Sequence, residues 1–260
     1  MTTTLRGVPR PGAAERVFIA RSLRHSLRAV DALLMAILLP TMLMFLFTFV
    51  FGGALDGSGG YVDYVVPGII LTCAGFGASY TAVSVNTDMT GGLIERIRTM
   101  PIGGTAVLTG HIVASVMKNL LATGIVIGLA VAIGFRPSAN LPAWLAALAL
   151  VTLWILAITC VFAALGLAAR SPDAAFGFGF ILLFLPYLSS AFVPLSTLPD
   201  WLRPIAEHQP VTPVIETIRG LLMGGADAAT SAVAVAWCAG FIAVALLWAA
   251  WLYRRATERR

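Results

Sequence analysis

Long apolar segments separated by short polar ones make up most of this sequence of 260 residues. A helix advances about 1.5 Å per residue, so about 20 apolar residues cross about 30 Å of hydrocarbon. The polar connections are too short for a separate water-soluble domain. The expected fold class is therefore an all-α membrane protein with six transmembrane helices. We predict the spans at residues 32–51, 65–85, 112–135, 145–169, 174–195 and 232–253.

The composition agrees with this fold class. Hydrophobic residues make up 59% of the chain and charged residues 11%, and the mean hydropathy is +0.91. Soluble domains typically carry about 25% charged residues. Each of the three cysteines, Cys73, Cys160 and Cys238, lies inside an apolar segment, which indicates small buried side chains and neither a disulfide framework nor a metal site.

The arginines predict how the chain is oriented. With six spans both termini lie on one side, and thirteen arginines fall on that side. Only Arg136, Arg203 and Arg219 fall on the other. By the positive-inside rule both termini are cytoplasmic, and we expect a multi-pass protein of the bacterial plasma (inner) membrane. The net charge of +5 follows from this asymmetry, and we expect no nucleic-acid partner.

The chain is expected to divide into three parts. Residues 1–31 form a cytoplasmic arm, residues 32–253 the six-span domain and residues 254–260 a basic cytoplasmic tail. Within the arm, residues 15–30 predict an amphipathic elbow helix that lies in the interface with the bilayer. Its basic face carries Arg21, Arg24 and Arg28, which suit anionic headgroups. A disordered basic tail is the alternative.

The segment at residues 196–230, between the fifth and sixth spans, is long but not polar. The Thr-Pro pair at 212–213 is a helix start signal, and the Gly-Gly pair at 224–225 is a stop signal. We predict short re-entrant helices here, with Glu216 and Arg219 paired on the more hydrated face. The alternative is a plain surface loop.

Polar side chains within the spans are few. His111, Ser115 and Lys118 share one helical stripe, which indicates either a polar pathway lining or a lysine that snorkels to the headgroups. The polar residues at 86–88 are expected to help end the second span. Two pairs of small residues allow close helix approach, Gly124 with Gly128 and Ala236 with Gly240.

A charged island interrupts the apolar pattern at residues 91–101. The Gly-Gly pair at 91–92 releases the chain from the second span, and Pro101 ends the island. The pattern predicts a two-turn amphipathic helix that either enters a groove on a cytosolic partner or lies on lipid. Its apolar face carries Leu93, Ile97 and Met100, and its charges are Glu95, Arg96 and Arg98.

The island resembles the short cytoplasmic motif of type-2 ABC transporter permeases. The matching run is Asp88-x-x-x-Gly92-x-x-Glu95-Arg96-x-Arg98-x-x-Pro101. The region after the fifth span is similar to the daunorubicin-resistance-type branch of these permeases. The similar runs are Ser190-Ala191-Phe192-Val193-Pro194, Leu198-Pro199-Asp200-Trp201-Leu202, Gln209-Pro210-Val211-Thr212-Pro213 and Arg219-Gly220-Leu221-Leu222.

The resemblance implies the permease half of an ABC exporter for a hydrophobic or amphipathic cargo, such as an antibiotic or a lipid. A second permease copy or a paralogue would pair with it. A cytosolic ATPase would carry ATP and Mg, and this chain, which has no phosphate-loop motif, would bind no cofactor or metal and would not be an enzyme. The implied contacts with the ATPase are Leu93, Glu95, Arg96, Ile97, Arg98 and Pro101.

Two other functions are possible on the residues alone. A secondary transporter is disfavoured because no carboxylate lies in the middle of a span. A rhomboid-like intramembrane protease would use Ser79 as its nucleophile and His111 as its base. The packed-helix interpretation, in which the small residues around Ser79 serve close helix packing, is favoured over the protease.

Overall fold

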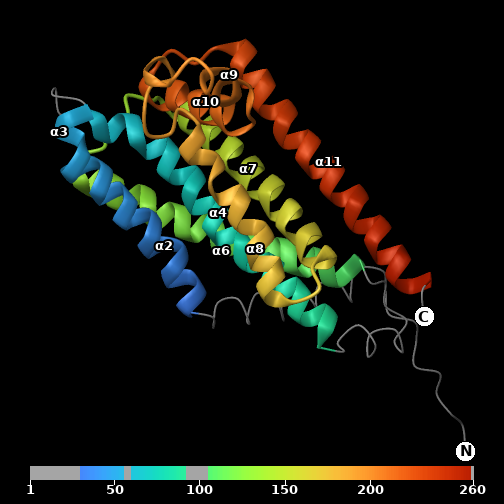
Figure 1. Cartoon of the computed structure of the whole chain (residues 1–260). Helices are drawn as coiled ribbons and strands as arrows, with labels where there is room; N and C mark the ends of the chain where they lie inside the picture. The colour runs from blue at the N-terminus through green and yellow to red at the C-terminus, as the bar shows by residue number, and fades with distance from the viewer. Residues whose placement is uncertain (1–29, 56–59, 92–104, 259–260) are drawn as a thin grey trace, which may run out of the picture.

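The computed structural model describes residues 30–55, 60–91 and 105–258, and all regular structure in these residues is helical, as predicted. The long helices lie side by side, with α9 and α10 at one end of the bundle (Figure 1). In chain order the elements are α2 (Val30–Phe45), η1 (Leu46–Phe51), α3 (Gly52–Leu55), α4 (Tyr61–Thr90), α6 (Thr105–Ile133), α7 (Leu141–Ala168), α8 (Pro172–Leu183), η2 (Leu185–Leu188), η3 (Leu195–Thr197), α9 (Arg203–His208), α10 (Val211–Met223) and α11 (Ala228–Glu258).

Five helices in the described part of the chain are long and apolar enough to cross a membrane. They correspond to the first four predicted spans and the last one. The predicted span at 174–195 instead forms α8, of 12 residues, followed by the 3-10 helix η2. Pro186 has no N–H to donate to the carbonyl four residues earlier, which explains why the α-helix stops. The six-span count is therefore not confirmed.

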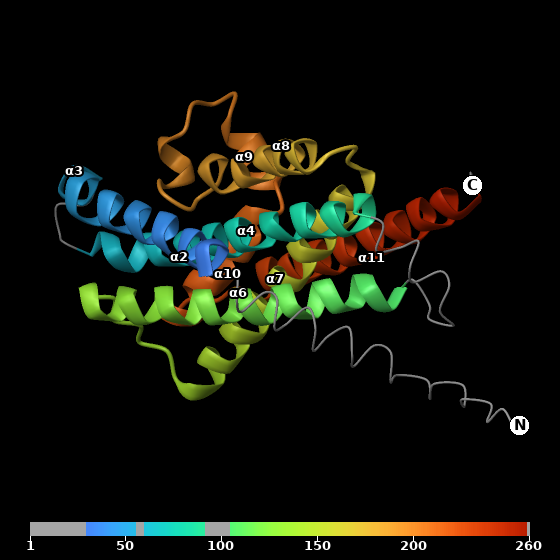
Figure 2. The ribbon, with the colours of Figure 1, turned by 90° about the horizontal axis from the view of Figure 1, so that it is seen from below.

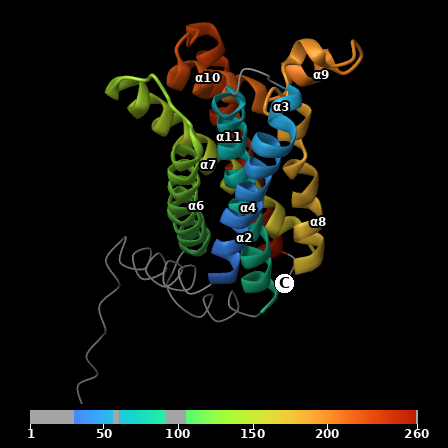
Figure 3. The same cartoon turned by 90° about the vertical axis from the view of Figure 1, so that its left-hand side faces the viewer.

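Helix α4 is the centre of the bundle. It packs against α2, α6, α7, α8 and α10, and α6 and α8 lie on opposite sides of it (Figures 2 and 3). We call the end of the bundle where α4 begins the apical end, and the end where α4 and α11 stop the basal end. Because other helices enclose α4, it lies in the protein interior. Helix α4 runs from the apical end to the basal end.

Local signals explain where several helices begin and end. Asn140 accepts a hydrogen bond from the N–H of Ala143 (3.0 Å) at the start of α7. Asp227 accepts one from the N–H of Thr230 (2.8 Å) at the start of α11, which lowers the pKa of this carboxyl group. The glycines at 224–225 have φ values of +92° and +89°, which confirms the predicted stop of α10.

The outward faces of α2, α6, α8 and α11 expose large apolar side chains. Leu38, Leu121, Phe180 and Leu247 are examples, with exposed fractions of 51%, 48%, 49% and 72%. This surface suits hydrocarbon and not water. The predicted small-residue pairs also lie on it: a Cβ added at Gly124, Gly128 or Gly240 would meet nothing within 4 Å.

The crossing of α4 and α7 depends on a glycine. A Cβ added at Gly166 of α7 would overlap the carbonyl oxygen of Ala82 in α4. The side-chain amide of Asn86 donates to the carbonyl oxygens of Gly166 (3.1 Å) and Ala169 (2.7 Å). The two helices therefore approach to backbone contact near their basal ends.

Replacing Gly166 by alanine should destabilise the chain by about 1–3 kcal/mol, because rotation of a side chain cannot relieve overpacking against backbone. Gly240→Ala is the matched control, since its added methyl meets nothing within 4 Å and alanine is the better helix former. Thermal melting of the purified variants in detergent measures the difference. Equal melting temperatures would contradict the close crossing.

Candidate functional site

The predicted ATPase-contact residues lie outside the described residues, within 92–104, and the predicted membrane-interface residues lie outside them too, within 1–29. The structure therefore tests neither set: Leu93, Glu95, Arg96, Ile97, Arg98 and Pro101, and Arg21, Arg24 and Arg28. The structure describes the helices on both sides of the island.

Helix α4 ends before the island at Thr90, where the N–H of Gly91 donates to the carbonyl of Thr87 (2.8 Å). Helix α6 begins after the island at Thr105.

A hydrogen-bond contact between side chains joins the two helices that flank the island. Nε2 of His111 in α6 lies 2.9 Å from Oδ2 of Asp88 in α4. Both side chains are partly buried, so solvent screens the contact less than it would at an open surface. The basal ends of α4 and α6 are thereby held together next to the island.

The polar residues at 86–88 do not end α4, which continues to Thr90. Asn86 instead donates to carbonyl oxygens at the end of α7, where carbonyl groups lack partners within their own helix. Thr87 bonds within its own helix, to the carbonyl of Val83 (2.9 Å). The prediction failed because the partner of Asn86 is about 80 residues away in the chain.

The stripe of His111, Ser115 and Lys118 faces α4, as its spacing allows. The hydroxyl of Thr81 in α4 donates to that of Ser115 (2.5 Å). Nζ of Lys118 lies 5.5 Å from the ring centroid of Tyr80, and only 6% of this lysine is exposed. Lys118 thus lies between two helices, and the structure does not support the expectation that it snorkels.

Further along the same interface Asn119 and Gly77 fit together. A Cβ at Gly77 would overlap the side-chain oxygen of Asn119, so the amide occupies the space that glycine leaves. The protease alternative finds no support at this interface. The hydroxyl of Ser79 donates to the carbonyl of Phe76 (2.7 Å) and His111 pairs with Asp88, so these residues form no Ser–His pair.

At the apical end the guanidinium of Arg219 in α10 binds two backbone carbonyl groups and one carboxylate side chain. Its Nη2 donates to the carbonyl oxygens of Ser190 (2.7 Å) and Tyr64 (3.1 Å). Its Nη1 lies 2.7 Å from Oε1 of Glu216, which confirms the predicted pair. The guanidinium also stacks on the ring of Tyr64 at 3.9 Å. The side chain of Arg219 is only 14% exposed, so it reaches inward from the predicted hydrated face.

Three further side chains bind carbonyl groups beyond the end of α8. The hydroxyls of Tyr61 and Tyr64 donate to the carbonyls of Phe192 (2.5 Å) and Ser190 (2.9 Å). The amide of Gln209 donates to those of Leu185 (3.1 Å) and Leu188 (2.7 Å). We call residues 185–223 the lid. Polar residues at the start of an apolar span, such as Tyr61 and Tyr64, were the available sequence signal for these contacts.

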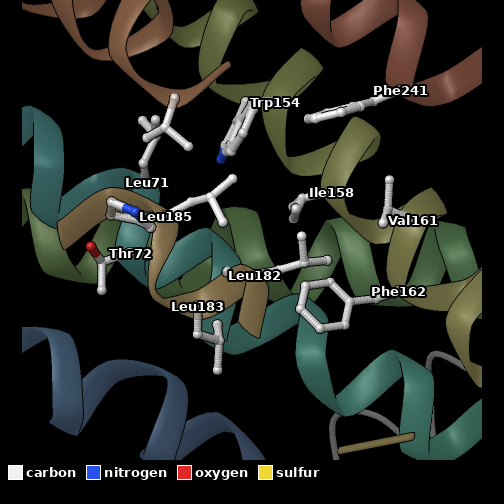
Figure 4. Close-up of a pocket in the computed structure, with 13 residues that line it drawn as sticks. Leu71, Thr72, Trp154, Ile158, Val161, Phe162, Leu182, Leu183, Leu185 and Phe241 are labelled. Carbon is white, nitrogen blue, oxygen red and sulfur yellow. The ribbon is translucent and has the colours of Figure 1, made fainter. Parts of the chain in front are cut away.

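A cavity of about 50 Å³ lies beneath the lid, lined by residues of α4, α7, α8, η2, α10 and α11 (Figure 4). Ligand pockets for drug-sized molecules are usually about 300–1,000 Å³, so this space is too small for a whole molecule of that kind. The cysteines Cys73, Cys160 and Cys238 are buried and unpaired, as predicted. The residues that the structure describes contain no cluster of metal-binding side chains.

Comparisons with known proteins agree with this architecture. A model of the ABC-2 type transporter family matches residues 14–223. The chain is 28% identical over 253 residues to a daunorubicin resistance ABC transporter permease protein of Streptomyces coeruleorubidus, covering 94% of this chain and 89% of the relative. It is 27% identical over 260 residues to a probable doxorubicin resistance ABC transporter permease protein of Mycobacterium tuberculosis, covering 95% and 94%.

Replacing Arg219 by lysine should loosen the lid, because an ammonium cannot reach both carbonyl oxygens and Glu216 at once. Losing hydrogen bonds from a charged donor costs about 2–3 kcal/mol, so hydrogen exchange at residues 189–192 should accelerate. Arg136→Lys is the control, since Arg136 is exposed and donates to carbonyl groups outside the lid, those of Val131 and Phe135. Exchange mass spectrometry compares the two, and equal protection would contradict the assignment.

Proposed function

Because this chain belongs to the ABC-2 type transporter family and is a membrane subunit of an ABC exporter, we propose that a separate cytosolic ATPase drives it. That partner would bind ATP and Mg and hydrolyse the nucleotide, and this chain would bind neither. The sequence contains no Gly-x-x-x-x-Gly-Lys-Ser/Thr phosphate loop, which is consistent with this division of labour.

The observation that carries the proposal is the course of α4. It runs from Tyr61 to Thr90, with the island directly after its basal end and two lid contacts, Tyr61 and Tyr64, at its apical end. A packed helix moves as a rigid element. Displacement of the island by a closing ATPase would therefore move the lid contacts with α4.

The partner contact would be made by the island at residues 91–101. Leu93, Ile97 and Pro101 would supply apolar contacts, and Glu95, Arg96 and Arg98 the charged rim. The contact between Asp88 and His111 supports this role, since it fixes the helices on both sides of the island.

The proposed topology has six spans, with α8 and the residues up to 195 forming the fifth. Helices α9 and α10 would be the short re-entrant helices of the outer leaflet. The distribution of arginines supports a cytoplasmic basal end, with both termini there, in a bacterial plasma membrane. Arg21, Arg24 and Arg28 would hold the elbow helix on anionic lipid.

The proposed cargo is a hydrophobic or amphipathic compound. The relatives are named for resistance to daunorubicin and doxorubicin, and the apolar surface of this chain suits cargo of that kind. Since the cavity beneath the lid, at about 50 Å³, is too small for such a cargo, the proposed pathway lies between this chain and a second permease copy or a paralogue. The outward-facing small-residue pairs are compatible with such packing.

Replacing Glu95 and Arg98 together by glutamine should slow association with the ATPase and so reduce export about tenfold, because complementary charges at the rim of an interface steer association. Efflux of daunorubicin from cells that express the chain with its ATPase measures the effect, and membrane fractionation checks insertion. The control removes one acidic and one basic charge outside the lid, by Asp173→Asn with Arg170→Gln, because both residues are exposed where α8 begins. Normal efflux by the island variant would argue against a motor contact.

The purified chain alone should hydrolyse no ATP, and export in vesicles should begin only when the ATPase and ATP are added. A phosphate-release assay and a vesicle transport assay measure the two. ATP turnover by the chain alone would refute the division of labour. Export driven by a proton gradient without ATP would favour a secondary transporter.

A further inference from the structure

The cavity beneath the lid contains a hydrogen-bond donor without a partner. Trp154 is 3% exposed, and no group in the described residues accepts a hydrogen bond from its Nε1. Figure 4 shows the ring with its nitrogen at the end that faces the cavity. A buried N–H without an acceptor costs about 1–3 kcal/mol, so this position favours any molecule that brings one.

Water is a poor occupant of this cavity. A buried water typically makes about three hydrogen bonds, whereas only Trp154 and Thr72 in the lining carry polar side-chain atoms, so a water would have at most two side-chain partners. The hydroxyl proton of Thr72 is already donated to the carbonyl of Gly68 (2.8 Å). An apolar molecule that carries an oxygen atom could accept the hydrogen bond from Trp154. The carbon atoms of the same molecule would contact the apolar side chains that line the rest of the cavity.

The cavity is reached from the surface of the bundle. Val161 of α7, Leu182 of α8 and Phe241 of α11 line it and are partly exposed, so they border its mouth. Trp154 lies near the middle of α7, which spans Leu141–Ala168. On the proposed topology the mouth faces the hydrocarbon of the bilayer, between the middle of α7 and its basal end. A molecule dissolved in the hydrocarbon can therefore supply the acceptor.

The size of the cavity limits which part of a ligand enters. A cavity of about 150 Å³ holds a benzene ring, and this one is about 50 Å³. It can hold a carbonyl group with an adjacent carbon or two, while the rest of the molecule stays in the mouth. A methyl ketone on a hydrocarbon chain has this shape.

We propose that the cavity is a binding site for apolar compounds that carry a carbonyl oxygen. The oxygen accepts a hydrogen bond from Nε1–H of Trp154, and the hydrocarbon part lies among Val161, Leu182 and Phe241. The site needs this chain alone, so it is independent of the proposed ATPase coupling and is tested without it.

The test is a titration of the ¹⁵N-labelled chain in lipid nanodiscs with 2-undecanone, with n-undecane as the matched probe that lacks oxygen. The chain has six tryptophans, and Trp154→Phe identifies the indole N–H signal of Trp154. We expect 2-undecanone to move that proton signal downfield and n-undecane to leave it in place. The other indole signals report that the protein remains folded.

Val161→Phe should block the mouth and weaken binding of 2-undecanone about tenfold. The larger side chain would take the space at the mouth that the hydrocarbon part of the ligand occupies. Val244→Phe is the control, since Val244 is 66% exposed on α11. The proposal is overturned if saturating 2-undecanone leaves the Trp154 signal unchanged or if n-undecane moves it equally. It also fails if Val161→Phe binds as well as the control.

Discussion

Backbone carbonyl groups without helical partners are the constraint on which the apical end of this protein depends. Where α8 stops at Leu183, the chain continues without a long helix to hydrogen-bond its backbone. In a membrane such groups must find partners within the protein. Gln209, Tyr61, Tyr64 and Arg219 supply them. The lid is therefore held by side chains from α4, α10 and the segment between α9 and α10.

The same helix that supplies two of these side chains also organises the basal end. Asn86 of α4 binds the last carbonyls of α7, and Asp88 contacts His111 of α6. Contacts at both ends of one enclosed helix give the exporter subunit a direct mechanical connection. The polar interface between α4 and α6, with Lys118 against Tyr80, lies between these ends and adds specificity to the packing.

The length of the apolar runs was enough to predict the five long helices that could span a membrane, because apolar length is a local property of the sequence. The stop at Gly224 and the pair of Glu216 with Arg219 are local as well, and both were correct. The carbonyl partners of Arg219 and the α7 contact of Asn86 join residues 29 to 155 positions apart. The pattern of apolar residues contains no information on such contacts, whereas the end of α8 follows from the local signal of Pro186.

The fit between Gly77 and Asn119 has a consequence for how this family can diverge. Because the amide of Asn119 fills the volume where a side chain at residue 77 would lie, a larger residue at 77 would require the Asn119 side chain to move, and a smaller residue at 119 would leave a void. We therefore expect a larger residue at 77 to be accepted most readily together with a smaller residue at 119, because the two positions share one volume between α4 and α6.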